Sequence, residues 1–380
     1  MITLDRTIGE EKVDTGFVVG MLLLLGFGLM TLFASTYDTA IKLKEGNALY
    51  YFEQQLAHGL IGIVVLVALA NIPLEFIRKL LPCIVLFSLV LCLLTFVPGI
   101  GLERNGAKRW IQFPFIGQFQ PSELAKISIV FYLANLFDKK KDKLNSVYAT
   151  ILPATIGLLS FVLIVFLQND FSTAIFLFVL GIAIFFVVGV KFYWFILFAF
   201  FAVPMGILFI FVEKYRVERV LGFLAPNFDI GGMNYQITAA KKAIASGGFW
   251  GQGIGSSIRK IASVPAIQDD FIFVGWTEMM GMFGVVLYFV LLFYFAYRGY
   301  KIAFSAKQTF DTLLVFGFTT SIVLQSLMNV GVVVGALPST GITLPFFSSG
   351  GTSLLITLCM CGFIINVSKK QRKEERGDVY

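Results

Sequence analysis

Two adjacent carboxylates stand out in a chain that is otherwise mostly apolar. They lie in the stretch Gln268-Asp-Asp-Phe-Ile-Phe273, where a long polar segment runs into an apolar one, and Glu278 follows two helical turns later. A carboxylate in such a place can accept a proton from an attacking hydroxyl group. It can also cap the N-terminus of the following helix, because Asp is a preferred capping residue. The residues alone leave both interpretations open.

Other charged residues precede further apolar stretches. The segment Gln120-Pro-Ser-Glu-Leu-Ala-Lys126 contains Glu123 and Lys126, which are three residues apart and therefore share one face of a helix. An acid in the first turn stabilises a helix N-terminus, but a charged pair in a membrane helix is costly and is typical of a functional site. Asp170, in Gln168-Asn-Asp-Phe-Ser-Thr173, lies between two apolar stretches and could likewise be a helix N-cap.

Small and polar residues interrupt the chain in two further places. Between two apolar stretches, the segment 338–353 reads PSTGITLPFFSSGGTS. Non-helical backbone of this kind is tolerated in a membrane where it packs inside protein or lines a cavity. The stretch Ser246-Gly-Gly-Phe-Trp-Gly-Gln-Gly-Ile-Gly255 has the glycines of a dinucleotide fingerprint. It lacks the strand, the βαβ context and the later acid, so the sequence predicts no nucleotide site there.

The elements that must position these residues are membrane helices. Of the 380 residues, 57% are hydrophobic and 14% are charged, whereas soluble domains usually carry about a quarter charged residues. Lipid-facing helices also accommodate the 42 phenylalanines. The four cysteines lie within apolar runs, without the spacing of metal ligands or of a disulfide framework. We therefore expect an integral membrane protein with free cysteines.

About ten segments are apolar over nearly the 20 residues that a helix needs to cross the hydrocarbon core. They lie near residues 16–36, 57–73, 80–98, 122–137, 148–167, 171–190, 192–212, 271–296, 312–336 and 350–367. The segment 122–137 is short and amphipathic at its start. An even number of spans puts both termini on one side. We therefore predict an all-α, polytopic bundle of about ten transmembrane helices over residues 16–367, with one large outer loop at about 213–270.

Basic residues in the short loops set the expected orientation. These loops hold Arg78, Lys79, the run 139–143, Arg298, Lys301 and Lys307. By the positive-inside rule they face the cytoplasm, together with the N-terminal segment 1–15 and a short, disordered basic tail at 368–380. The opposite loops, near 99–122 and 213–270, are also basic. The rule tolerates this in long translocated loops, but it also fits an anionic ligand such as a lipid-linked phosphate.

Taken in order, these segments resemble the SEDS family (shape, elongation, division and sporulation), whose members polymerise peptidoglycan. The resemblance covers about residues 16–367 and rests on five spaced motifs, at 105–110, 120–126, 168–173, 235–273 and 329–353. Asn105-Gly-Ala-Lys-Arg-Trp110 and Asn329-Val-Gly-Val-Val-Val-Gly335 are more similar to the division branch of the family than to the rod-elongation branch.

The resemblance implies a peptidoglycan glycosyltransferase that acts on lipid II, a disaccharide pentapeptide carried on undecaprenyl pyrophosphate. The reaction would take place at the outer face of the bacterial cytoplasmic membrane, for the division branch at the septum. The family's catalytic acid corresponds to Asp270, which would take the proton from the attacking 4-hydroxyl group. Ordinary glycosides also need a general acid, but pyrophosphate leaves as a stable anion, so cations can replace that acid.

The same resemblance nominates residues for a substrate cavity. Candidates for binding the phosphates are Arg109, Lys126, Arg219 and Lys260. Glu123 is expected to pair with Lys126 and hold the cavity together. Candidates for lining or shaping the cavity are Asp170, Gln236, Glu278, Ser348, Gly350, Gly351 and Ser353. No cofactor or metal site is fixed, and a divalent cation, Mg²⁺ or Mn²⁺, is the one candidate, as a further source of positive charge at the phosphates.

Two positions depart from the family pattern. Gln-Pro-Asp-Leu-Gly-Thr becomes Gln168-Asn-Asp-Phe-Ser-Thr173, which loses the proline, and a pair of glutamates becomes Glu278-Met279. The implied partners are lipid II, a class B penicillin-binding protein with transpeptidase activity and other divisome membrane proteins, with no nucleic acid. Two other functions stay open at this point. A lipid II flippase would need the cavity but no positioned base, and a scaffold would only recruit the transpeptidase.

Overall fold

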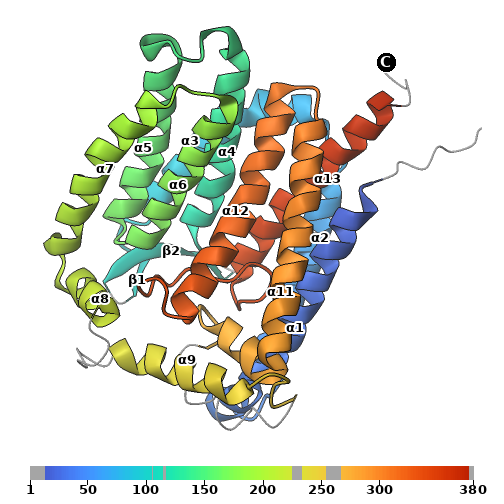
Figure 1. Ribbon diagram of the computed structural model, residues 1–380, viewed down its shortest axis with the longest axis vertical. Helices are drawn as coiled ribbons and strands as arrows, with labels where there is room; N and C mark the ends of the chain where they lie inside the picture. Colours follow the sequence, from blue (N-terminus) through green and yellow to red (C-terminus); the bar gives the residue numbers. More distant parts are fainter. Residues whose placement is uncertain (1–12, 105, 114–116, 225–232, 254–266, 376–380) are drawn as a thin grey trace, which may run out of the picture.

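The computed structural model describes residues 13–104, 106–113, 117–224, 233–253 and 267–375. Long helices lie side by side along one axis, and a small sheet and two short helices gather at one end (Figure 1). The long helices are α1 (Thr15–Leu43), α2 (Tyr50–Leu69), α3 (Leu74–Leu94), α4 (Pro121–Lys139), α5 (Leu152–Leu167), α6 (Phe171–Val188), α7 (Tyr193–Val212), α11 (Ile272–Ser305), α12 (Thr309–Val333) and α13 (Gly351–Glu375).

These helices confirm the predicted all-α membrane bundle. Each of the predicted segments corresponds to one long helix, and nine of the described helices are long and apolar enough to cross a membrane. The remaining long helix is α4, the segment with the weakest apolar signal. It packs against α3, α5, α6, α12 and α13, and aromatic residues such as Phe131 and Phe137 are fully buried on it. Surrounding helices, rather than lipid, therefore cover α4, which is why it can carry a buried ion pair.

The loops at one end have structure that the sequence did not predict. Residues 99–122 contain a three-stranded antiparallel sheet with the order β1 (Gly101–Arg104), β2 (Ala107–Phe113) and β3 (Gly117–Phe119). The large loop at 213–270 contains α8 (Lys214–Leu224) and α9 (Met233–Gly247). The tail expected to be disordered from residue 368 continues α13 to Glu375, because Lys370 lies 2.9 Å from Asp311 and anchors this extension.

The two ends of the bundle differ in character. At one end the start of α1 meets the end of α13: the backbone N–H of Asp14 donates to Ser368, and its carboxylate lies 2.6 Å from Arg298. The short basic loops gather at this end, where Arg78 of α3 pairs with Asp138 of α4. At the opposite end lie the sheet, α8 and α9 (Figure 1). The first and last described segments, at the start of α1 and the end of α13, are thus on the same side of the bundle.

Helix α11 is broken close to its start. Gly281 has φ 61° and ψ −156°, a backbone conformation that only glycine adopts readily. The turn after α9 takes up the hydrogen bonds that the break frees: the N–H groups of Gln252 and Gly253 donate to the carbonyls of Glu278 and Met279. In return, Met282 and Phe283 donate to carbonyls of this turn. The glycine-rich stretch therefore serves as a backbone partner for α11.

Candidate active site

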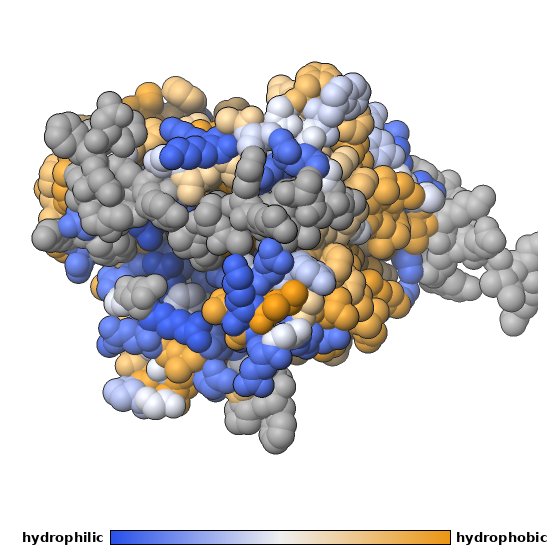
Figure 2. Space-filling view, turned by 90° about the horizontal axis from the view of Figure 1, so that it is seen from below, coloured by the Kyte–Doolittle hydropathy of each residue, from blue (hydrophilic) through white to orange (hydrophobic). Residues whose placement is uncertain are grey.

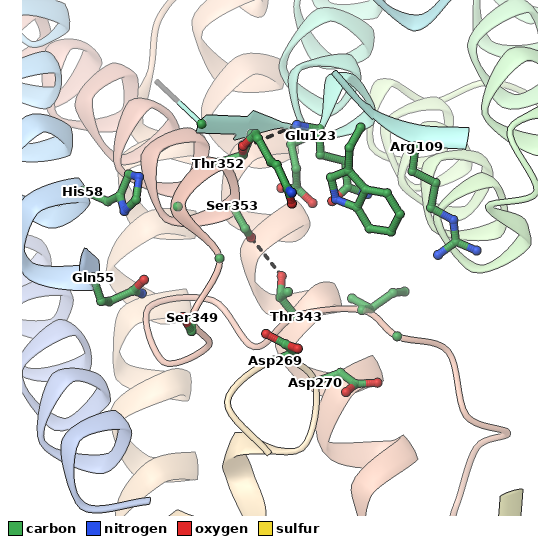
Figure 3. Close-up of a pocket in the computed structure, with 18 of the residues that line it drawn as sticks. Gln55, His58, Arg109, Glu123, Asp269, Asp270, Thr343, Ser349, Thr352 and Ser353 are labelled. Atoms are coloured by element: carbon green, nitrogen blue, oxygen red, sulfur yellow. Dashed lines mark hydrogen bonds between the residues drawn. The ribbon is translucent and has the colours of Figure 1, made fainter. Parts of the chain in front are cut away.

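A cavity of about 700 Å³ lies at the end of the bundle that carries the sheet (Figure 3). Seen from that end, hydrophilic side chains gather towards the middle of the face and apolar ones along its margins (Figure 2). The N-terminal ends of α2, α4, α6, α11 and α13 all meet this cavity. Helix N-termini carry partial positive charge, so their convergence favours an anionic ligand.

Most of the residues nominated from the sequence line this cavity. They are Arg109, Glu123, Lys126, Asp170, Asp270, Gly350, Gly351 and Ser353. They come from β2, α4, α6, the residues just before α11 and the start of α13, so segments more than 200 residues apart in the chain meet here.

Asp270 is the carboxylate whose surroundings best suit it to accept a proton. Burial raises its pKa to about 6, and neighbouring Asp269 adds to this effect, whereas a hydrogen bond to its own backbone and the charge of Arg219 oppose it. Its backbone carbonyl accepts a hydrogen bond from Asn329 Nδ2 at 2.7 Å, and the same amide group donates to Ile342 O. Asn329 therefore holds Asp270 against the segment 338–343.

The helix-cap interpretation of Asp270 is wrong in this structure. The N-cap position of α11 is occupied by Phe271, and no side chain caps the helix. The carboxylate instead lines the cavity, where Gly341 leaves room beside it: a Cβ on that glycine would lie 3.9 Å from Asp270 Oδ2. Asp269 also lines the cavity, and burial raises its pKa to about 6, opposed by the charge of Arg104.

Glu123 and Lys126 form the predicted pair in the cavity wall. Lys126 Nζ lies 2.8 Å from Glu123 Oε1, and both side chains are more than nine-tenths buried. The same ammonium group donates to Gln325 Oε1 at 2.6 Å, and Gln325 Nε2 donates to Thr343. Thr343 in turn is hydrogen-bonded to Ser353. The ion pair thus connects α4, α12 and the start of α13 in one network.

Asp170 combines the two roles that the sequence left open. Its carboxylate accepts a hydrogen bond from the backbone N–H of Thr173 and so caps α6. It also faces the cavity, 3.6 Å from Arg109, whose other terminal nitrogen donates to the carbonyl of Asn169. Capping therefore fixes the carboxylate that in turn orients the arginine.

The loss of the family's proline at position 169 has a structural reason. Asn169 has φ 60°, which the proline ring cannot adopt. Its side-chain amide donates to Gly106 O at the turn between β1 and β2 and accepts from Arg216 of α8. Arg216 also lies over the rings of Phe166 and Phe171. Asn169 thus joins the sheet and α8 to the start of α6.

Several nominated residues do not line the cavity. Glu278 is fully buried behind it in α11, where it accepts a hydrogen bond from Ser246 of α9. Ser348 is buried and accepts from the N–H of Leu344, so it shapes the segment 338–350 from inside. Arg219 donates to the carbonyl of Ser339, and its charge lowers the pKa of Asp270. Gln236 lies on α9, outside the cavity lining. Lys260 lies outside the described residues.

Sequence reasoning missed one whole wall of the cavity. It consists of Tyr50, Tyr51, Gln54, Gln55 and His58, all from the first turns of α2. Lys44, Arg104, Gln118, Gln120 and Thr343 were missed as well. The α2 residues open an apolar segment, and their position at the cavity depends on the packing of α2 against α13. The one available signal was that His58 is the single histidine of the chain.

The formal charges of the described lining side chains cancel. Four are cationic, namely Lys44, Arg104, Arg109 and Lys126, and four are carboxylates, namely Glu123, Asp170, Asp269 and Asp270. Among the described residues, no three His, Cys, Asp or Glu side chains come together as a closed metal site. Asp269 and Asp270 nevertheless offer two carboxylates, and hard divalent cations commonly complete such a pair with phosphate oxygens and water.

Comparison with known proteins places the chain among relatives of nearly equal length. Residues 15–373 match the family model FTSW_RODA_SPOVE, described as cell cycle protein. A probable peptidoglycan glycosyltransferase FtsW from Borreliella burgdorferi is 37% identical over 363 residues, which are 94% of this chain and 97% of that protein. Stage V sporulation protein E from Bacillus subtilis is 32% identical, over 96% of this chain and 100% of that protein.

Solved structures share the fold. One is a chain of a peptidoglycan synthase complex that coordinates polymerization and crosslinking. It superposes with a TM-score of 0.77 at 27% identity, and the match covers 94% of this chain and 98% of that chain. The rod shape determining protein RodA from Thermus thermophilus superposes with a TM-score of 0.67 at 24% identity, over 94% of this chain and 97% of that chain.

Proposed function

Because the chain belongs to the FtsW, RodA and SpoVE family of cell cycle proteins, we propose that it is a peptidoglycan glycosyltransferase that polymerises lipid II. One observation carries the proposal from the structure. Asp270 lines the cavity without capping a helix, and its pKa is raised to about 6. A general base works best when its pKa lies near the working pH.

The reaction needs one positioned base. Asp270 takes the proton from the 4-hydroxyl group of the acceptor sugar while that oxygen bonds to the anomeric carbon of the donor. The bond between this carbon and the pyrophosphate oxygen breaks, and undecaprenyl pyrophosphate leaves with the electron pair. Arg109, which Asp170 and Asn169 hold at the cavity, and the converging helix N-termini stabilise the negative charge on the leaving group.

A divalent cation fits this site. The lining charges cancel, so the side chains supply no net positive charge for a pyrophosphate. Mg²⁺ or Mn²⁺ carried by the pyrophosphate oxygens and water would neutralise charge on the leaving phosphates, and the Asp270 carboxylate would keep its role as the base. Lys126 contributes less than the sequence suggested, because Glu123 and Gln325 occupy its ammonium group.

The proposed location rests on the charges at the two ends of the bundle, and the proposed partners rest on the relatives. The short basic loops gather at the end opposite the cavity, so the positive-inside rule puts both termini in the cytoplasm and the cavity at the outer face of the cytoplasmic membrane. The similarity to FtsW proteins supports the division branch, and for that branch we propose the septum as the location and other divisome membrane proteins as partners. A class B penicillin-binding protein would then cross-link the strands, in keeping with the synthase complex that shares the fold.

The test is lipid II polymerisation by the purified protein with its transpeptidase partner. Asp270→Asn keeps the size of the side chain but cannot accept the proton, so we expect a loss of about 10²- to 10⁴-fold in rate. Asp269→Asn makes the same charge change one residue away and should cost much less. Near-normal polymer from Asp270→Asn would contradict the assignment of the base. Equal losses in both variants would indicate local charge instead.

The same purified protein separates the other functions that the sequence leaves open. Polymer formation supports the enzyme. Movement of fluorescent lipid II across liposome bilayers without polymer would indicate a flippase, and neither activity would indicate a scaffold.

A further inference from the structure

The α2 wall, defined as Tyr50, Tyr51, Gln54, Gln55 and His58, differs in chemistry from the rest of the cavity. Its five side chains are uncharged amides, phenols and one imidazole. The carboxylates of the cavity instead come from α4, from the start of α6 and from the residues before α11. Gln55 and His58 lie on the side of the cavity away from Arg109 (Figure 3). The five side chains of the α2 wall are therefore uncharged, with the Lys44 ammonium group beside Tyr50, and the described carboxylates of the cavity come from other elements.

His58 presents a defined hydrogen-bonding group. Its Nδ1 lies 2.7 Å from the carbonyl oxygen of Gln54. A carbonyl only accepts hydrogen bonds, so Nδ1 carries a proton, and in the neutral tautomer this leaves Nε2 as an acceptor. The start of α13 packs against the face of this ring, where a Cβ on Gly351 would come within 2.6 Å of Nε2, 2.7 Å of Cε1 and 2.8 Å of Cδ2. Glycine at position 351 therefore leaves room for the His58 ring, which lines the cavity.

The other members of the wall are held in place. Gln55 is 2% exposed, and its Nε2 donates to the carbonyl of Ser348 at 2.7 Å, which ties α2 to the segment before α13. The rings of Tyr50 and Tyr51 meet edge to face at 5.3 Å, and Lys44 lies over the Tyr50 ring at 4.3 Å. Fixed amides and aromatic rings form a preorganised surface for a ligand that is polar but uncharged.

Sugar rings have this chemistry, since they carry hydroxyl and acetamido groups around an apolar ring face. We propose that the α2 wall binds the uncharged sugar rings of the acceptor, with His58 Nε2 accepting a hydrogen bond from a sugar hydroxyl. The assignment rests on the proposed function, because that function supplies both a sugar acceptor and a pyrophosphate donor. The pyrophosphate then belongs to the opposite side, beside Arg109, and the acceptor hydroxyl lies between that side and the α2 wall, within reach of Asp270.

Binding without turnover separates this proposal from the proposed function. The full-length protein in nanodiscs carries Asp270→Asn to prevent polymerisation. Two probes are titrated, each followed by ligand-observed NMR: the uncharged disaccharide of two N-acetylglucosamine units, which has the same hydroxyl and acetamido groups, and inorganic pyrophosphate. His58→Phe keeps a ring but removes the acceptor, and His58→Gln keeps an acceptor oxygen. Leu60→Phe, on the exposed face of α2 outside the cavity lining, is the matched control.

We expect His58→Phe to weaken disaccharide binding about three- to tenfold, the usual effect of one hydrogen bond, and to leave pyrophosphate binding unchanged. His58→Gln should recover part of the loss, and Leu60→Phe should bind both probes like the parent. Failure of the parent to bind the disaccharide, or equal weakening of both probes by His58→Phe, would overturn the proposal. Failure of the wild-type protein to polymerise lipid II, with disaccharide binding intact, would overturn only the proposed function.

Discussion

At the scale of single residues, burial sets the pKa of Asp270. An ordinary aspartate titrates near 3.9, whereas burial beside Asp269 raises the pKa of Asp270 to about 6. A raised pKa keeps the carboxyl protonated, and so unable to accept a proton, at pH values where most aspartates are ionised. The pKa of the base thus lies close to neutral pH, where little free energy is needed to ionise the carboxyl group.

The pH profile of polymerisation should show this titration. Since only the ionised carboxylate accepts a proton, we expect the rate to rise as pH increases from about 5 to about 7, around the pKa of about 6. In Asp269→Asn the rise should persist with its midpoint at lower pH, because the neighbouring negative charge that raises the pKa of Asp270 is removed. A rate that is flat between pH 5 and pH 8 would contradict this account.

The ion pair of Glu123 and Lys126 should be strongly coupled. Replacing Lys126 with alanine strands a buried carboxylate, and we expect it to lower the free energy of unfolding by about 3–5 kcal/mol. Replacing both residues should cost less than the sum of the single changes, because neither charge is left unpaired. Unfolding in mixed micelles measures both effects.

The matched control is the exposed pair of Lys108 and Glu103, whose charged atoms lie 3.9 Å apart. Loss of this pair should lower the free energy of unfolding by at most about 1 kcal/mol. Additive costs at the buried pair would rule out the coupling.

At the scale of elements, the break in α11 is the feature that joins α11 to α9. Gly281 approaches the turn after α9 so closely that a Cβ would lie 2.4 Å from Gly251 N and 2.5 Å from Phe249 O. Below the break, Ser246 of α9 is hydrogen-bonded to Glu278. An unbroken helix would satisfy these backbone groups internally and would not form hydrogen bonds with the glycine-rich turn.

Gly281→Ala should therefore disrupt the contact between α9 and α11. Backbone strain and overlap with the turn should destabilise the protein by about 2–4 kcal/mol or more, seen as a lower Tm in detergent. Gly206→Ala in α7 is the control, because nothing lies within 4 Å of the added Cβ and alanine favours a helix by about 1 kcal/mol. Similar Tm values for the two variants would show that the break does not depend on glycine.

At the scale of the whole molecule, the two ends of the bundle should face different compartments. In a protein without its native cysteines, Asn47→Cys, in the exposed link between α1 and α2 at the cavity end, should react with an impermeant thiol reagent in intact cells. Asn227→Cys, outside the described residues but in the large loop predicted at about 213–270, should react as well. Asp142→Cys, exposed after α4 at the opposite end, should react only after lysis. The reverse pattern would invert the topology and remove the outer active site.

The sequence by itself determined the features that depend on local composition. Hydropathy over about 20 residues located the spans, and the spacing of Glu123 and Lys126 put them on one helix face. Local composition left Asp170 and Asp270 as either helix caps or functional carboxylates, and only the family resemblance nominated them for the site. The short strands of the sheet were missed, since β1, β2 and β3 are three to seven residues long and gain their stability only from one another.

Only the tertiary structure decided which side chains meet. Gln325 sits in an apolar helix and becomes a partner of Lys126 because α12 packs on α4. His58 reaches the cavity because α2 packs on α13 and Gly351 leaves it room. Glu278, two turns from Asp270 in sequence, is turned away into the α9 contact instead. A helix places its own residues by periodicity, whereas the neighbour that each face meets depends on how separate helices pack, and no local pattern encodes that choice.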